Sequence, residues 1–260
     1  MLSANSGEQK GKGMQGRART ALGIVAMMLA GCGGGLGAGS TGTPGSGTAY
    51  SFVAPASGVI RMYAEVVVDN SANTINIGYS DTTATVNANG SYVADVQSTT
   101  GDSTIVNGTN YAVTDENESY DDSGQEVSYT FTTSTGTLVS CTYDPHANGP
   151  DFPVQVGQTW QIEYTLACND GSTTVSYLQK GSVVDVESLT VPAGTFTALK
   201  FQSTVSWTNA DGTVRNETTT NWRDTKTLYT LKQQIAIAVS GTVPANGYPV
   251  SRTSELQSIS

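Results

Sequence analysis

A two-residue alternation of apolar and polar side chains runs through most of this sequence. Its clearest run places Leu199, Phe201, Val205 and Trp207 opposite Lys200, Gln202, Thr204 and Ser206. A period of two is typical of a β-strand with one buried face, and a helical period of 3.6 occurs almost nowhere after residue 32. The sequence therefore predicts an all-β protein with antiparallel sheets, arranged as a sandwich or as a curved half-barrel.

Turn signals separate the alternating runs. Residues 209–212 read Asn-Ala-Asp-Gly and are followed by a second run from Val214 to Trp222, which predicts a β-hairpin with a loop of four or five residues. An earlier run alternates in the same way over residues 61–69: Met62, Ala64, Val66 and Val68 are interleaved with Arg61, Tyr63, Glu65 and Asp69.

The beginning of the chain has the order of an export signal. Arg17 and Arg19 precede an apolar run over residues 21–30, and Leu29, Ala30 and Gly31 lead to Cys32. The apolar run is about half the length that a membrane-spanning helix needs, so a cleaved secretory signal is the better interpretation.

Leu-Ala-Gly-Cys closely resembles the lipobox of bacterial lipoproteins. The resemblance implies that Cys32 is acylated on its sulfur, becomes the first residue of the mature protein and holds it to a membrane through its acyl chains. Gly33 stands where an Asp would retain such a protein in the inner membrane. The resemblance therefore implies an envelope protein anchored in the outer membrane, on its periplasmic or its cell-surface face.

Composition divides the chain into four segments. Residues 1–31 form the signal peptide and residues 32–49 a Gly-, Ser- and Thr-rich tether, with a root-mean-square reach of roughly 20–24 Å. Residues 50–145 form an acidic β half and residues 146–260 a second β half. A proline-rich stretch over residues 144–153 marks the boundary as either a domain junction or a crossover within one body.

Charge excludes one class of partner. The chain has a formal charge of −10 at pH 7, and removal of the signal peptide makes it more acidic, since four basic residues leave with one acidic residue. Nucleic-acid binding through phosphate contacts is therefore not expected. No Lys or Arg occurs between Met62 and Gln179. That asymmetry is interpreted either as a source of solubility or as a face that attracts cations or cationic ligands.

An acidic run in the first half could bind a hard cation such as Ca²⁺, which prefers several oxygen ligands. The candidate ligands are Asp115, Glu116, Glu118, Asp121, Asp122 and Glu126. The run lacks the spacing of a known calcium loop, so a solvated loop between strands is the competing interpretation. No other metal site and no cofactor is expected.

Two cysteines remain after Cys32. Cys141 and Cys168 each share the apolar face of an alternating run, and export would place them in an oxidising compartment. A disulfide between them is the first interpretation, and two buried free thiols are the second. His146 is the single histidine, and no Gly-x-Ser-x-Gly elbow accompanies it, so the sequence contains no recognisable catalytic centre.

Residues 152–260 resemble a loose group of uncharacterised β-rich bacterial lipoproteins. The resemblance rests on Val-Gly-Gln-Thr-Trp at 156–160, Val-Pro-Ala-Gly-Thr-Phe at 191–196, and Trp222 followed by Leu-Tyr-Thr-Leu-Lys at 228–232. It implies an antiparallel sheet and carries no established activity.

The sequence as a whole favours a non-catalytic binding or structural lipoprotein of unknown ligand or protein partner. A first alternative is a periplasm-facing carrier of a lipid or other hydrophobic ligand. The apolar lining of such a carrier would come from Trp160, Ile162, Phe201, Trp207 and Trp222. A second alternative is a hydrolase of polysaccharides, which would need two carboxylates at a defined separation.

Overall fold

Twelve β-strands make up the fold in the computed structural model, which describes residues 47–106, 109–133, 136–147, 149–170, 174–209, 212–241 and 248–260. In chain order the strands are β1 (Ile60–Asp69), β2 (Thr74–Val86), β3 (Tyr92–Val106), β4 (Thr109–Tyr120), β5 (Glu126–Thr132), β6 (Leu138–Ala147), β7 (Thr159–Cys168), β8 (Val175–Val191), β9 (Gly194–Thr208), β10 (Val214–Asp224), β11 (Thr230–Ser240) and β12 (Pro249–Ile259). The prediction of an all-β antiparallel protein is confirmed.

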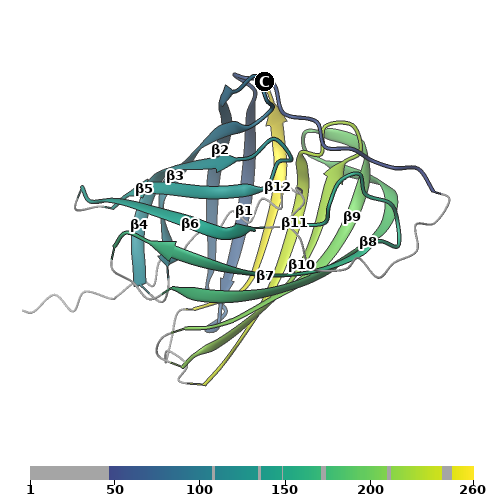
Figure 1. The fold of residues 1–260 in the computed structure, drawn as a ribbon. Coiled ribbons are helices and arrows are strands. Elements are labelled where there is room, and N and C mark those ends of the chain that lie inside the picture. The colour runs from purple at the N-terminus through teal and green to yellow at the C-terminus, as the bar shows by residue number, and fades with distance from the viewer. Residues whose placement is uncertain are drawn as a thin grey trace, which may run out of the picture.

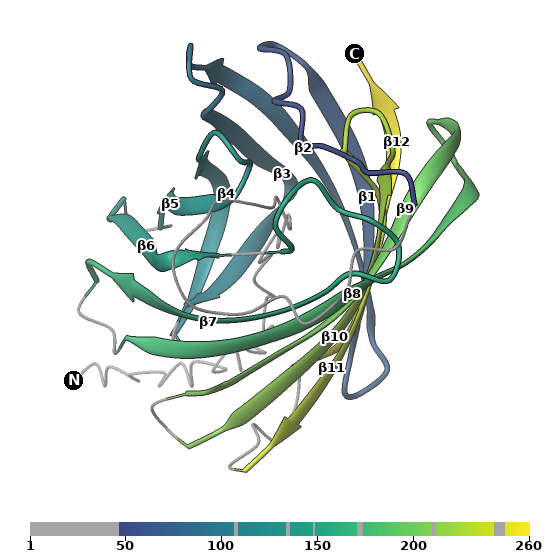
Figure 2. The same cartoon turned by 45° about the vertical axis from the view of Figure 1, so that its right-hand side comes forward.

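The strands form one sheet that closes on itself. Each strand pairs antiparallel with the next strand in sequence, and β1 pairs with β12, so that the order around the barrel is complete (Figures 1 and 2). The sheet therefore curves further than the expected half-barrel, until its two edges meet. Closure satisfies the backbone groups that an open edge strand would leave unpaired.

The two expected β halves contribute strands to the same barrel. The proposed boundary at residue 145 falls within β6, which pairs with β5 on one side and β7 on the other. Residues 1–46, which include the signal peptide, Cys32 and nearly all of the tether, lie outside the described residues. Among the residues that are described, no helix is long and apolar enough to cross a membrane.

The barrel interior is rich in aromatic side chains. In a barrel made of one sheet the buried face is the inner one, and Leu199, Phe201 and Val205 are buried there as the alternation predicted. Tyrosines from most of the other strands are also buried, among them Tyr63, Tyr79, Tyr92, Tyr120, Tyr129, Tyr143, Tyr164 and Tyr177. Many of these rings stack on one another, as Tyr92 and Tyr120 do at 4.5 Å between ring centres.

Strand β1 turns its polar residues inward, against its apolar alternation. Arg61, Tyr63 and Glu65 are buried, while Val66 is 39% exposed on the outer face. Two ion pairs explain the orientation: Arg61 contacts Asp81 of β2, and Glu65 contacts Arg252 of β12 at 3.1 Å. Buried charges are tolerated when they are paired in this way.

The hairpin predicted at residues 209–212 is present, and three other hairpins that contain a glycine share its turn. Asn209 N–H donates to the Thr213 carbonyl and Gly212 N–H donates to the Asn209 carbonyl, each at 2.9 Å. The same two bonds close the β2–β3, β4–β5 and β5–β6 hairpins, with Gly90, Gly124 and Gly136 at positive φ. These are short loops whose glycine adopts the left-handed conformation.

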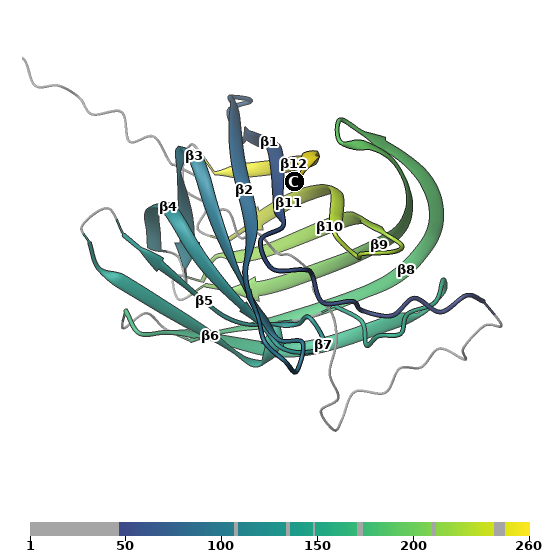
Figure 3. The same cartoon turned by 90° about the horizontal axis from the view of Figure 1, so that it is seen from above.

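A strap of residues 50–55 leads from the tether into β1 and runs over one end of the barrel (Figures 1 and 3). Tyr50 and Val154 exchange two backbone hydrogen bonds of 2.9 Å, which fix the start of the strap. The ring of Phe52 lies directly on Gly124 and near the rings of Tyr92 and Phe152. A Cβ atom at Gly124 would lie 2.3 Å from that ring, so glycine is required there.

Candidate functional site

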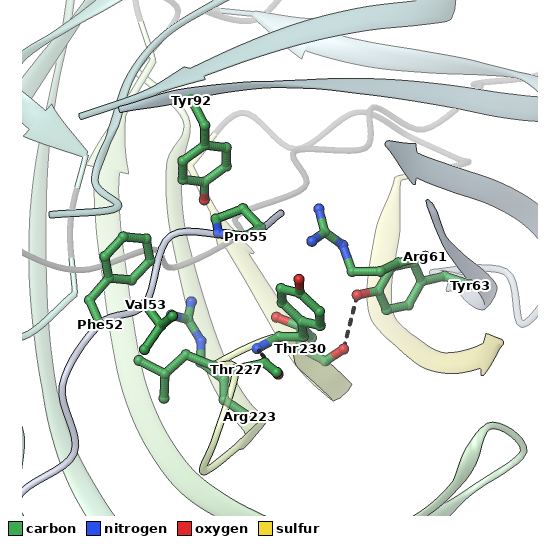
Figure 4. A pocket seen from close by; sticks show the side chains of 11 residues that line it. Phe52, Val53, Pro55, Arg61, Tyr63, Tyr92, Arg223, Thr227 and Thr230 are labelled. Carbon is green, nitrogen blue, oxygen red and sulfur yellow. Dashed lines mark hydrogen bonds between the residues drawn. The ribbon is translucent and has the colours of Figure 1, made fainter. Parts of the chain in front are cut away.

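A pocket lies between the strap and the end of the barrel at which β1 and β3 begin and β10 ends (Figure 4). It has a volume of about 410 Å³ that includes its opening to solvent. The strap supplies Phe52, Val53 and Pro55. The barrel and the β10–β11 turn supply Arg61, Tyr63, Tyr92, Arg223, Thr227, Leu228, Tyr229 and Thr230. The lining thus combines apolar walls with two guanidinium groups, a composition typical of a small-molecule site.

The first guanidinium is neutralised. Arg61 Nη2 and Nε donate to the two carboxylate oxygens of Asp81 at 2.5 and 3.2 Å, and the Arg61 guanidinium lies 4.6 Å from the ring centre of Tyr229. Burial alone would lower the pKa of Arg61, but the adjacent Asp81 raises it above its usual value. The bidentate pair therefore holds Arg61 charged and satisfied.

The second guanidinium has no counterion. Arg223 is 5% exposed, and within the described part of the chain no carboxylate lies within ion-pair distance and no acceptor bonds its side chain. Its one close side-chain contact of note is the ring of Phe201, at 5.6 Å from the ring centre. Burial lowers the pKa of Arg223 to about 10, against the opposing effect of nearby tyrosine phenols. The group therefore remains protonated at neutral pH.

The polar groups nearest to Arg223 are engaged elsewhere. Asp224 is its chain neighbour, but the Asp224 carboxylate accepts the N–H and hydroxyl of Thr227 at 3.1 and 2.8 Å and stabilises the β10–β11 turn. The Tyr63 hydroxyl donates to the Thr230 carbonyl at 2.9 Å. The pocket lining consequently contains two positive groups and no carboxylate, and the acid nearest to the first of these groups, Asp81, is bound to Arg61.

The six predicted cation ligands belong to β4, to the start of β5 and to the turn between them. Glu116, Glu118 and Glu126 are buried, and Asp122 is exposed. Asp121 accepts the backbone N–H groups of Ser123 and Gln125, each at 2.9 Å, and contacts His146 Nδ1 at 2.8 Å. The side chain of Asp115 lies outside the described residues.

No group of three or more His, Cys, Asp or Glu side chains is placed to hold a metal ion in the portion of the chain that is described. The calcium site stays a prediction. The acidic run is also not a simple solvated loop, because three of its carboxyl groups are buried in the barrel.

Two of the buried glutamates, Glu118 and Glu126, have raised pKa values. Tyr120 donates a short hydrogen bond to Glu118. Burial raises the pKa of Glu118 to about 8, and the nearby Asp81 raises it further, against the effect of the Tyr120 bond. Burial likewise raises the pKa of Glu126, which also lies near Glu118 and Glu116. Protonation therefore removes the cost of burying these charges.

The structure also shows where the two cysteines and the proposed carrier lining lie. Cys141 of β6 and Cys168 of β7 lie opposite each other and form a disulfide. The five side chains proposed as a carrier lining are divided among three separate core clusters. None of the five lines the pocket at the strap.

Sequence reasoning missed the pocket and both of its arginines. The alternation over residues 61–69 puts Arg61 on the polar side of a strand, and no sequence motif marks Arg223. One signal was present for Arg61: it is the last basic residue before a long acidic stretch without Lys or Arg, and it pairs with Asp81 of that stretch. That Arg223 has no acidic partner in the described structure follows from the strands that the barrel brings around it, which the sequence does not reveal.

No protein-family model and no curated protein matches this chain. Two solved structures are similar to it over 82% of its length, each with a TM-score of 0.48. One, from Bacteroides fragilis, is named as an exported protein with a YmcC-like fold; it is 13% identical and is covered completely. The other, from Parabacteroides distasonis, is named as a lipoprotein; it is 12% identical and 99% covered. Likeness at this level leaves the function of this chain to be inferred from its own residues.

Proposed function

We propose that this protein is a non-catalytic, lipid-anchored protein of the cell envelope that binds a small molecule in the pocket between the strap and the barrel. The pocket carries the proposal: it opens to solvent, and its walls combine apolar side chains with a buried guanidinium that lacks a partner in the described structure. Pockets with a few convergent polar groups on apolar walls are the usual sites of ligand binding.

The anchor is proposed from the sequence. Cys32 follows an export signal, and the tether joins it directly to the strap that lines the pocket. Binding, and not catalysis, is proposed because the single histidine pairs with Asp121 in the β4–β5 turn and is not part of the pocket lining.

The neutral dye N-phenyl-1-naphthylamine tests the pocket, because its fluorescence rises when it enters an apolar site. The full chain carrying Cys32→Ala is used, so that no attached acyl chain competes with the dye. Val53 is 54% exposed on the strap, and Val53→Trp places a large ring at the pocket entrance without disturbing the core. We expect the variant to lose most of the dye signal.

Val66→Trp is the matched control, since Val66 is exposed on the outer face of β1 away from the pocket. It should bind the dye as the parent chain does. An equal loss in both variants, or no dye binding by the parent chain, contradicts the proposed function.

A further inference from the structure

We infer that the pocket recognises an oxyanion, a carboxylate or a phosphate, attached to an apolar body, and that Arg223 is the residue that binds the anionic group. This inference rests on the proposed function and names the class of its ligand.

Arg223 is a charge without compensation. Moving a guanidinium out of water costs several kcal/mol unless it is paired, so an unpaired buried arginine is rare in a core that serves only for stability. Arg61 illustrates the ordinary solution a short distance away, with both of its bonds to Asp81. A ligand that supplies two oxygens would give Arg223 the same bidentate pairing.

Among the described residues, the carboxylates near this end of the barrel are already engaged. Asp81 is fully buried against Arg61, and Asp224 is committed to the backbone and hydroxyl of Thr227. Phe201 offers only the face of its ring to Arg223. An uncompensated cation at a solvent-open pocket attracts an anion locally, although the chain as a whole is acidic.

The strap gives the pocket an apolar wall, which an apolar portion of the ligand would contact. Phe52, Val53 and Pro55 form one wall of the pocket, and Leu228 forms part of the other. Leu228 and Pro55 are buried, whereas Val53 is exposed and available for contact. A free inorganic anion would leave these apolar walls without a partner, so we expect a ligand with both an oxyanion and an apolar portion.

Two dyes with one skeleton separate the anionic contact from the apolar one. 8-Anilinonaphthalene-1-sulfonate is N-phenyl-1-naphthylamine with an added sulfonate. In the full-length Cys32→Ala chain, we expect Arg223→Met to weaken binding of the sulfonate dye by about tenfold or more and to leave the neutral dye unchanged. Lys226→Met removes an exposed charge from the β10–β11 turn and should change neither dye.

Competition identifies the anion and needs no variant. Decanoate and decyl phosphate should each displace the neutral dye from the parent chain at concentrations at least about tenfold lower than decanol, which has the same chain and no charge. This measurement tests the inference even if Arg223→Met fails to fold. Equal displacement by decanol overturns it, and displacement by inorganic phosphate as effective as by decyl phosphate overturns the apolar half.

The two proposals fail in different ways. If the neutral dye binds, Val53→Trp blocks it, and Arg223→Met leaves the sulfonate dye unaffected, then the pocket is a binding site and the inference about its ligand is wrong. If Val53→Trp has no effect on either dye, the proposed site itself is wrong.

Discussion

Buried acidic side chains give this protein an unusual interior. Glu118 lies against the Tyr120 hydroxyl on β4, and Glu126 lies close by at the start of β5. Neither has a basic partner among the residues described, because the nearest basic residue in the interior, Arg61, is paired with Asp81. The folded state therefore accommodates Glu118 by keeping it protonated to a pH above neutrality.

The stability of the protein should fall as the pH rises from about 4.5 to about 8, the ordinary and the folded pKa of Glu118. Over this interval the unfolded chain has lost the Glu118 proton and the folded protein still holds it, so each rise in pH favours unfolding. Glu118→Gln has no proton to lose. Urea unfolding at pH 5 and pH 8 should therefore show the variant gaining stability, relative to the parent, at the higher pH.

Glu163→Gln is the control for that experiment, since Glu163 is exposed on β7. Its stability should follow the pH dependence of the parent chain. Parallel pH curves for Glu118→Gln and the parent would show that Glu118 does not titrate in this interval.

The β4–β5 hairpin supports the strap, and the strap forms one wall of the pocket. The β4–β5 and β5–β6 hairpins close with the same pair of backbone bonds, and each has a glycine at a φ of about 80°. They differ in their surroundings. Gly124 lies under the Phe52 ring of the strap, while a Cβ atom at Gly136 would meet nothing within 4 Å.

Gly124→Ala should release the strap, and Gly136→Ala should not. Both variants carry the strain of a left-handed alanine, about 1–2 kcal/mol. Only Gly124→Ala also displaces the Phe52 ring, because the new Cβ atom would lie 2.3 Å from that ring. Chymotrypsin cleavage after Tyr50 or Phe52, followed by mass spectrometry, should be faster in Gly124→Ala. Equal cleavage of the two variants would show that the strap is held by its other contacts.

Strand assignment from sequence succeeded where one face of a strand is apolar. β9 alternates from Leu199 to Trp207, and the Gly212 turn fixes its register with β10, so local residues were sufficient. The opposed positions of Cys141 and Cys168 followed from the same alternation. β1 shows the limit of the method, because its inward face is determined by partners on other strands.

The pocket was not predictable for a related reason. Its walls come from the strap, from β1 and β3, and from β10 and β11, which lie far apart in the sequence. Hydrophobic periodicity describes one segment at a time. The unpaired state of Arg223 depends on which acids other elements leave available, and Asp81 and Asp224 are both taken by neighbours that the sequence does not reveal.

A buried ion pair joins the first and the last strand where the barrel closes. The first half of the chain is almost free of basic residues, and Glu65 obtains its partner, Arg252, from the last strand. Both side chains of this pair are about 6% exposed. At the other edge of β12 the tip of the β8–β9 hairpin also reaches this strand, where Ala193 N–H donates to the Leu256 carbonyl at 3.2 Å.

Removing one member of the closing pair should be costly, and removing both should not. Arg252→Met leaves Glu65 charged and buried, which we expect to lower the free energy of unfolding by about 3–5 kcal/mol. Adding Glu65→Gln should recover most of that loss in chemical denaturation. Lys232→Met serves as a control, because the Lys232–Glu255 pair is partly exposed and should contribute only about 0–1 kcal/mol. A double variant as unstable as Arg252→Met would contradict this account.

Closure between the first and the last strand also sets an order of events in time. Residue 62 pairs with residue 258, so β1 has no neighbour on one side until almost all of these residues have been synthesised. Contacts between such distant residues form slowly. Because synthesis begins at the N-terminus, β1 waits with an exposed strand edge, and the barrel closes only after β12 has left the ribosome.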